Sequence, residues 1–254
     1  MCGKYVKLHD SYISIVEAIK HAAAKLRVKP NIIWCDTEEI EKEPSKVTEL
    51  NNAHAVIVLP GFGARGVEGK IEAIRYVREN NIPFLGICYG MQLAVVEFAR
   101  NVAGLKGAHT TEVDPNTPYP VIDITPEEKN IEELGGTMIL GNRKIGIVKD
   151  TIAHMIYGTT EITERHRHRY EVNPKFFKVL NEKGLVFSAW RMDVPRVEMI
   201  ELPNHYFFVA TQFHPEFRSR PLRPHPLFIA LLNAALHRKH GLPSPYSVKY
   251  TVYA

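Results

Sequence analysis

The stretch from Pro83 to Gln92 constrains the fold more than any other. An apolar run, Phe84 to Ile87, stops at Cys88, glycines stand two residues before and after the cysteine, and helical spacing follows. A strand that enters a helix through Gly-x-Cys-x-Gly is the cysteine form of the nucleophile elbow. Such a turn places the sulfur at a helix N-terminus, where free N–H groups favour a thiolate and an oxyanion. A buried structural cysteine is the alternative, and the elbow alone leaves both open.

The composition is that of a folded domain in water. Of 254 residues, 45% are hydrophobic and 24% charged, and no apolar stretch could span a bilayer. The first residues lack the apolar segment of a secretory signal, so we expect a cytoplasmic protein with no membrane partner. Three widely spaced cysteines, Cys2, Cys35 and Cys88, argue against a disulfide framework and a zinc site.

The net charge of +4 comes largely from two short basic segments, 165–169 and 218–223. A nucleic-acid-binding protein usually spreads basic residues over one face, often with aromatic side chains between them. We therefore expect no nucleic-acid partner. An anionic small molecule or a partner domain explains two short segments better.

The first hundred residues alternate between predicted strands and helices. This alternation predicts a doubly wound α/β fold with a parallel sheet. Gly61 and Cys88 follow two neighbouring strands at their carboxyl ends, where such sheets place the active site. We expect strands at 3–8, 31–34, 55–59 and 84–87, and helices at 12–26 and 67–80.

The remainder of the chain has the spacing of antiparallel strands. Gly135-Gly136 predicts a turn, and Gly141-Asn142 predicts a second turn between hairpin strands at 137–140 and 144–148. We also expect strands at 165–170, 185–190, 196–202 and 206–212, helices at 151–157 and 225–238, and a poorly ordered tail at 242–254.

A nucleophilic Cys88 needs a base, and His214 has the sequence context of one. It follows an apolar strand and begins His214-Pro215-Glu216, where proline stiffens the turn so that the carboxylate can reach back to the imidazole. That acceptor selects the tautomer and stabilises the imidazolium. Cys88, His214 and Glu216 are thus a candidate nucleophile, base and orienting carboxylate. His214 alone would be an ordinary polar residue at a strand end.

The backbone offers a candidate oxyanion hole as well. The expected donors are the N–H of Tyr89, directly after the cysteine, and the N–H of Gly61, in the loop after the preceding strand. Gly61 can equally mark a tight turn, and both interpretations can hold together. His166 and His168 could suggest a metal, but with no carboxylate or thiolate nearby we expect no metal site.

Five motifs together resemble the class I (triad) glutamine amidotransferases and, among them, the C-terminal glutaminase domains of the CTP synthase family. The resemblance implies a flavodoxin-like three-layer α/β sandwich, whose central, mostly parallel sheet carries an added antiparallel part in the C-terminal half. It also implies a single domain over residues 1–254, with an ordered core of about 3–240. The motifs are 3–5, 86–92, 135–138, 165–173 and 212–217, of which 165–173 is the most specific.

The resemblance implies L-glutamine as the substrate. Cys88 would attack its side-chain amide, forming a γ-glutamyl thioester and releasing ammonia, and His214 would carry the protons. Water would then release glutamate. Gly61 and Tyr89 match the positions that stabilise the oxyanion. The positions that match glutamine-binding residues are Gly61, Tyr89, Gln92, Glu112 and Arg169.

The resemblance implies a partner too. The chain contains no phosphate-binding Gly-x-x-x-x-Gly-Lys-Ser/Thr motif, so we expect the amidoligase domain that aminates UTP to CTP to be absent from it. ATP and Mg²⁺ are expected in that domain, GTP as the allosteric activator of the full enzyme, and no cofactor in this chain. The full enzyme is expected to be a homotetramer.

Three positions depart from the family pattern. The loop Pro60–Gly63 has one glycine fewer than usual, Tyr89 stands where leucine is usual, and Ile139 stands where arginine is usual. Two alternatives stay open: a class I glutaminase that serves another acceptor, and a catalytically weak regulatory module of the same fold.

Overall fold

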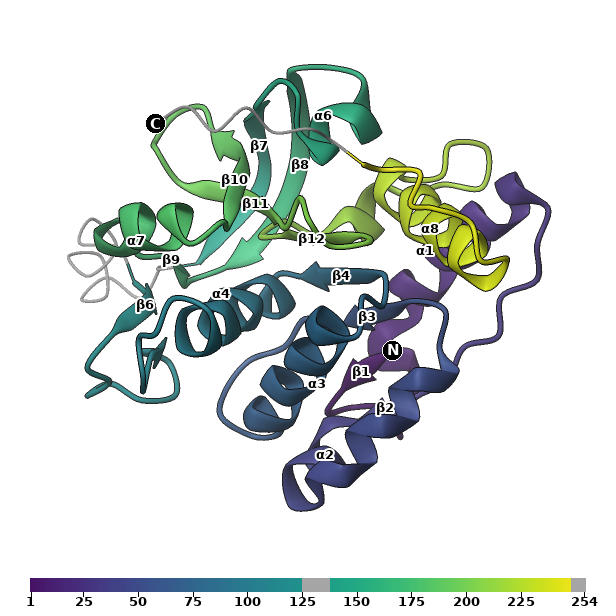
Figure 1. Ribbon diagram of the computed structural model, residues 1–254. Coiled ribbons are helices and arrows are strands. Elements are labelled where there is room, and N and C mark those ends of the chain that lie inside the picture. The colour runs from purple at the N-terminus through teal and green to yellow at the C-terminus, as the bar shows by residue number, and fades with distance from the viewer. Residues whose placement is uncertain (125–137, 248–254) are drawn as a thin grey trace.

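A computed structural model describes residues 1–124 and 138–247, in which two sheets are flanked by helices (Figure 1). The strands are β1 (Cys2–Gly3), β2 (Cys35–Asp36), β3 (Val56–Val58), β4 (Phe84–Ile87), β5 (His109–Thr110), β6 (Pro120–Asp123), β7 (Ile139–Ile147), β8 (Glu161–His168), β9 (Glu171–Val172), β10 (Val186–Arg191), β11 (Val197–Glu201) and β12 (Phe208–Thr211). The α-helices are α1 (Ile13–Leu26), α2 (Thr37–Lys42), α3 (Val67–Glu79), α4 (Tyr89–Asn101), α6 (Ile152–Tyr157), α7 (Phe177–Glu182) and α8 (Pro226–Lys239). Short 3₁₀ helices cover His9–Tyr12, Pro44–Asn52, Pro174–Phe176 and Pro215–Arg218.

The main sheet is mixed, with the strand order β2-β1-β3-β4-β12-β11-β10-β7-β8. Strands β2 to β12 in this order pair in parallel, and β12 to β8 pair antiparallel. β12 therefore joins the two halves, parallel to β4 on one side and antiparallel to β11 on the other. The small sheet, β5-β6-β9, packs against α4. The expected doubly wound half with an added antiparallel part is confirmed.

Helices cover both faces of the main sheet. Alternate residues of β3 and the Leu59 that follows it divide between two hydrophobic cores. Val56 and Val58 lie in the core that contains α3 and α4, and Ile57 and Leu59 lie in the core that contains α1 and α8. This explains why the run around β3 is apolar throughout, since a strand covered on both faces needs no polar side. Figure 1 shows α1 beside α8, away from α3 and α4.

Two predictions near the N-terminus are wrong. The strand expected at 3–8 covers only Cys2–Gly3, because a turn in which the N–H of Leu8 bonds Tyr5 O (3.0 Å) follows it. The strand expected at 31–34 lies at Cys35–Asp36 instead, where the N–H of Cys35 bonds Met1 O (3.0 Å). Pairing with β1 decides this register, and local alternation does not contain that information.

The predicted hairpin at 137–148 is also wrong. Residues 139–147 form one strand, β7, which pairs with β8 from Ile139↔His168 to Gly146↔Glu161. Gly141 adopts a positive φ of 83° inside this strand. The long partner β8 supplies hydrogen bonds along all of β7, and this pairing overrides the local turn signal. The turn predicted at Gly135-Gly136 and the tail beyond residue 247 lie outside the described residues.

The strand expected at 165–170 is displaced, because β8 begins at Glu161, where pairing with β7 starts, and ends at His168. The remaining predicted elements are confirmed to within about two residues, including α1, α3, α6, α8, β10 and β11. β12 is shorter than expected at both ends, because only Phe208–Thr211 pairs with β4. In the described part of the chain, no helix is both long and apolar enough to cross a membrane.

Candidate active site

Cys88 occupies the sharp turn between β4 and α4. Its backbone has φ 51° and ψ −101°, a conformation that costs energy for a residue with a side chain and is typical of functional turns. Glycines flank it because neighbouring strands come close. A Cβ on Gly86 would lie 2.9 Å from the Cβ of Ala210, and one on Gly90 would lie 2.3 Å from Val58 O. The elbow places the Cys88 sulfur at the N-terminus of α4.

His214 reaches Cys88 because β12 lies next to β4. The N–H of Cys88 donates to Thr211 O (2.7 Å), so the end of β12 is bonded to the elbow. His214 follows three residues later, and its Nδ1 lies 2.7 Å from Glu216 Oε1. Since a carboxylate only accepts, Nδ1 carries the proton, and Nε2 is the nitrogen left for the cysteine.

Two histidines lie near the cysteine, and their environments move their pKa values in opposite directions. Burial opposes protonation of His214, but the negative charges of Cys88 and Glu216 outweigh it and raise its pKa to about 10. Burial, with the positive charge of His166 added, lowers the pKa of His168 well below its ordinary value. His214 can therefore hold a proton near neutral pH, and His168 stays neutral.

The loop Pro60–Gly63 is held beside the elbow from several directions. Lys4 Nζ donates to Phe62 O, and the hydroxyl of Tyr89 donates to Gly63 O (2.9 Å). The N–H of Gly63 donates to Glu112 Oε1 (2.7 Å). Although the loop has one glycine fewer than the family pattern, these contacts hold it against the first residue of α4. Tyr89, which replaces the usual leucine, supplies one of them.

A buried lysine lies beneath this loop. Lys70, on α3, is 1% exposed, and its Nζ donates to Leu59 O (2.9 Å), directly before the loop. The ammonium lies 5.2 Å from the centre of the Tyr89 ring, and a Cβ on Gly61 would be 3.4 Å from it. Burial, with repulsion from Lys4 added, lowers the pKa of Lys70 to about 7. Lys70 brings positive charge close to both expected oxyanion donors.

The three other predicted substrate contacts surround the same site. Gln92, buried in the first turn of α4, donates from Nε2 to Tyr170 O (2.8 Å) and Gln212 Oε1 (3.3 Å), so its own carbonyl oxygen is the group that can serve a ligand. Glu112 is half-buried, and burial raises the pKa of its carboxyl group. Arg169 is exposed directly after β8 and close enough to Glu112 to act on its charge.

The family of the chain follows from comparison with known proteins. Residues 7–234 match the family model described as "Glutamine amidotransferase class-I". The chain belongs to the class I glutamine amidotransferase family. A solved member of this family, described as the Trypanosoma brucei CTPS glutaminase domain with bound acivicin, is 36% identical and superposes with a TM-score of 0.88, covering 98% of this chain and 96% of that one.

Curated relatives with longer chains have a higher sequence identity to this chain than that solved structure does. A CTP synthase from Caldivirga maquilingensis is 74% identical over 247 residues, which cover 97% of this chain and 45% of the relative. A CTP synthase from Pyrobaculum aerophilum is 59% identical over 239 residues, covering 94% of this chain and 45% of the relative. The chain thus spans about half the length of the curated relatives it matches.

The structure brings all the predicted site residues of this amidotransferase to one end of the β3–β4–β12 strands. Sequence reasoning missed Lys4, Lys70 and Gln212, whose Nε2 lies 3.8 Å from Cys88 Sγ. Lys70 had a signal, since it occupies a position on the apolar stripe of α3 between Val67 and Ile74. Gln212 had none beyond its place in a motif.

His166 and His168 do have carboxylates nearby, contrary to the prediction. His166 Nε2 lies 2.7 Å from Glu198 Oε2, because β11 brings that residue in from 32 positions away. His168 Nδ1 lies 3.9 Å from Glu171 Oε1. Within residues 1–124 and 138–247, no group of three or more potential ligands is arranged to hold a metal ion.

Replacing Lys70 by methionine is expected to stabilise the fold, and to do so most at low pH. Below pH 7 the ammonium is charged in the folded and unfolded states alike, so the full cost of burying it is present, on the order of 5 kcal/mol. Above pH 7 the folded protein releases this proton while the unfolded chain keeps it up to its ordinary pKa of 10.5, so the cost fades as pH rises. Melting temperatures at about pH 6, 8 and 10 should therefore show a gain that shrinks with pH.

The matched control is Lys20→Met, whose side chain is 56% exposed on α1 and which should change the melting temperature little at any pH. A Lys70→Met variant that is less stable than the original chain at pH 6 would contradict the expectation. Such a result would mean that the hydrogen bond to Leu59 O outweighs the cost of the buried charge.

Proposed function

We propose that this chain is the glutaminase part of a CTP synthase. It hydrolyses L-glutamine to glutamate and passes ammonia to an amidoligase domain that aminates UTP to CTP. The observation that carries the proposal is the buried set of Cys88, His214 and Glu216 at the elbow, in a chain 74% identical to part of a CTP synthase. Relatives about twice as long leave room for a second domain.

The chemistry begins with attack of the Cys88 sulfur on the side-chain amide carbon of glutamine. The oxygen becomes an oxyanion, which accepts hydrogen bonds from the N–H groups of Gly61 and Tyr89 and is stabilised by the nearby Lys70 charge. The His214 imidazolium gives its proton to the leaving nitrogen, so ammonia departs and a thioester remains. Water then attacks the thioester, His214 takes its proton, and glutamate leaves with the Cys88 sulfur restored.

Three polar groups around the elbow suit the two ends of glutamine. Arg169 can bind the α-carboxylate with two parallel hydrogen bonds. Glu112 can accept from the α-ammonium, and its pKa, raised by burial, returns toward normal when a cation arrives. The carbonyl oxygen of Gln92 remains as an acceptor for the side-chain amide. Together these contacts favour glutamine over amides without an α-amino acid group.

The partner completes the proposal. ATP, Mg²⁺ and UTP belong to the amidoligase domain, and GTP acts on the assembled enzyme, which we propose is a homotetramer. This chain itself needs no cofactor, since cysteine, histidine and backbone donors supply every step above.

An electrophilic glutamine analogue tests the proposal directly. We expect it to attach to Cys88 and to leave the buried Cys2 and the partly buried Cys35 unmodified, as read by mass spectrometry of the three peptides. Excess L-glutamine should slow the labelling, since both molecules compete for one site. Labelling that persists in a Cys88→Ala variant, or that glutamine does not slow, would overturn the proposal.

A further inference from the structure

The backbone of β8 contacts both members of the proposed catalytic pair. Arg165 O accepts from the N–H of His214 (2.9 Å), and Arg167 O lies 3.8 Å from Cys88 Sγ. His166 stands between these two carbonyl groups. Any shift of β8 therefore changes the position of His214 relative to Cys88.

The His166 side chain is anchored inside the protein at both ring nitrogens. On β8 the arginines are exposed and the intervening histidines are buried, and His166 is 1% exposed. Its Nδ1 lies 3.1 Å from Glu164 O, and its Nε2 lies 2.7 Å from Glu198 Oε2. A carbonyl oxygen only accepts, so Nδ1 donates to Glu164 O, and Nε2 lies at hydrogen-bond distance from the Glu198 carboxyl group.

Glu198 connects this anchor to the loop that carries His214. Its backbone oxygen accepts from the N–H of Gln212 (2.9 Å), two residues before His214. Its carboxylate binds His166 on β8. One residue of β11 therefore holds both segments on which the geometry of the catalytic pair depends.

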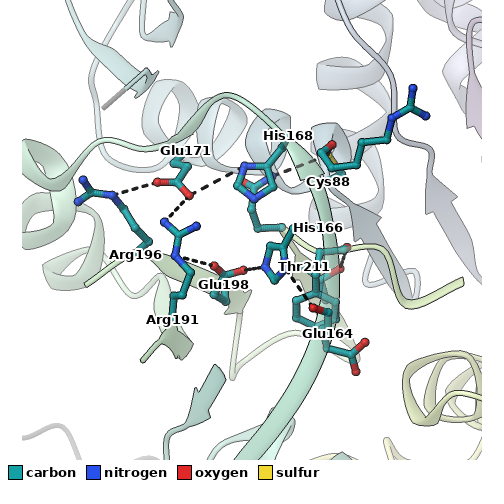
Figure 2. A network of polar contacts seen from close by, with 12 residues as sticks. Cys88, Glu164, His166, His168, Glu171, Arg191, Arg196, Glu198 and Thr211 are labelled. Atoms are coloured by element: carbon teal, nitrogen blue, oxygen red, sulfur yellow. Dashed lines mark hydrogen bonds and ion pairs between the residues drawn. The ribbon is translucent and has the colours of Figure 1, made fainter. Parts of the chain in front are cut away.

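Further buried charges hold Glu198 in turn. Figure 2 shows the chain of contacts: Glu198 Oε1 lies 3.8 Å from Arg191 Nε, Arg191 lies 2.8 Å from Glu171, and Glu171 lies 2.9 Å from Arg196. All four are at most 8% exposed. Buried ion pairs add little net stability compared with apolar packing, so stability alone does not account for this network.

We propose that His166 and Glu198 form a positioning pair for the proposed glutaminase, and the assignment rests on that proposed function. The pair ties β8 to the Gln212–His214 segment and so sets the separation of the Cys88 sulfur and the His214 imidazole. Among the described residues, no hydrogen bond or ion pair joins the two side chains to Gln92, Glu112 or Arg169, which are proposed to bind glutamine. Its loss therefore impairs the chemical step and leaves substrate binding largely intact.

Two substitutions of similar size at one position test the pair in the 254-residue chain. In His166→Gln, the longer side chain places its amide at the position of Nε2, so a donor that reaches Glu198 is kept. In His166→Asn, the shorter side chain places its amide near the position of Nδ1, so only the contact with Glu164 O is kept. For glutamine hydrolysis we expect His166→Asn to lower kcat by about 10- to 30-fold with KM within about threefold, and His166→Gln to stay within about threefold of the original chain. A near-normal kcat in the His166→Gln variant, beside the low kcat of His166→Asn, is a difference that a merely structural role of His166 does not produce.

A second readout needs no glutamine site. Iodoacetamide, a small neutral electrophile, reports how strongly His214 favours the Cys88 thiolate, and mass spectrometry separates Cys88 from Cys2 and Cys35. We expect alkylation of Cys88 near pH 7 to be about tenfold slower in His166→Asn and little changed in His166→Gln. Equal alkylation rates and equal kcat for the two variants, with only a lower melting temperature, would overturn the inference.

Glu198→Gln provides the fallback if His166→Asn does not fold, since it preserves volume and removes the charge. Its control is Glu201→Gln on the same strand, whose buried carboxylate binds the N–H groups of Ile152 (2.7 Å) and Ala153 (3.0 Å). We expect Glu198→Gln to lower kcat by about fivefold or more relative to Glu201→Gln. Indistinguishable variants would overturn the inference. If the original chain hydrolyses no glutamine, the proposed function fails, and alkylation still decides whether the pair positions His214.

Discussion

Replacement of Cys88 by alanine is expected to lower glutamine hydrolysis by at least about 10⁴-fold, to the background rate. No other thiol can take over the attack, because Cys2 is buried in β1, which β3 separates from β4, and Cys35 lies one strand further away in β2. The thioester cannot form, so ammonia and glutamate release should fall together. Coupled enzyme assays for ammonia and for glutamate measure the two rates of release.

The matched control for this prediction is Cys35→Ser, a partly buried thiol on the edge strand β2. It should retain hydrolysis within about twofold, since β1 and β3 separate β2 from the elbow after β4 and the change from sulfur to oxygen is small. Cys88→Ala should also keep its melting temperature within a few degrees, because the change removes one sulfur and no hydrogen-bonded carboxylate. Substantial hydrolysis by a folded Cys88→Ala protein would exclude Cys88 as the nucleophile.

Replacement of Glu216 by glutamine is expected to lower kcat/KM by about 10³-fold near neutral pH. Nearly all of the Glu216 side chain is buried, and its Oε1 lies 2.7 Å from His214 Nδ1. With Cys88, it raises the pKa of His214 to about 10 against the opposing effect of burial. Without this carboxylate the imidazolium loses its proton at lower pH, and the acid that protonates the leaving nitrogen, so that it departs as ammonia, is lost.

The pH dependence of this variant has a defined sign. The original chain should keep the imidazolium, and hence the alkaline limb of its pH–rate profile, up to about pH 10. In the Glu216→Gln variant, the alkaline limb of the pH–rate profile should move to lower pH. The stability that the pair contributes is fully present below the ordinary histidine pKa of 6.5 and is lost as pH rises toward 10, so the difference in melting temperature between the two proteins should be largest at low pH.

Glu17→Gln on α1, an exposed carboxylate in an ion pair with Lys20, is the control for removal of one negative charge. It should leave the pH–rate profile unchanged. An alkaline limb that stays in place in Glu216→Gln would show that this carboxylate does not support His214.

Much of the site could be predicted because it depends on short-range geometry. Gly86-x-Cys88-x-Gly90 requires the tight elbow, since any side chain at either glycine would meet a neighbouring strand. His214-Pro215-Glu216 places a carboxylate within reach of the imidazole over two residues. Such motifs keep their local conformation wherever they occur, so their chemistry can be inferred before the fold is known.

Long-range pairing explains most of what was not predicted. The hairpin expected around Gly141 is one strand because β8 pairs with all of it, and β2 begins at Cys35 because β1 lies beside it. Lys70 matters because α3 places it beneath the loop that begins after Leu59, and Glu198 matters because β11 places it beside His166. No periodicity in the sequence encodes those neighbours.

The sequence by itself determined the elbow, the order of nucleophile, base and orienting carboxylate, and the alternation that leads to a doubly wound sheet. These follow from steric limits and repeat periods acting over a few residues. Only the tertiary structure decided how His214 meets Cys88, how the loop before α3 is held, and which carboxylate anchors β8. Those depend on which strands lie side by side, and the energy of that choice is spread over contacts between residues far apart in the chain.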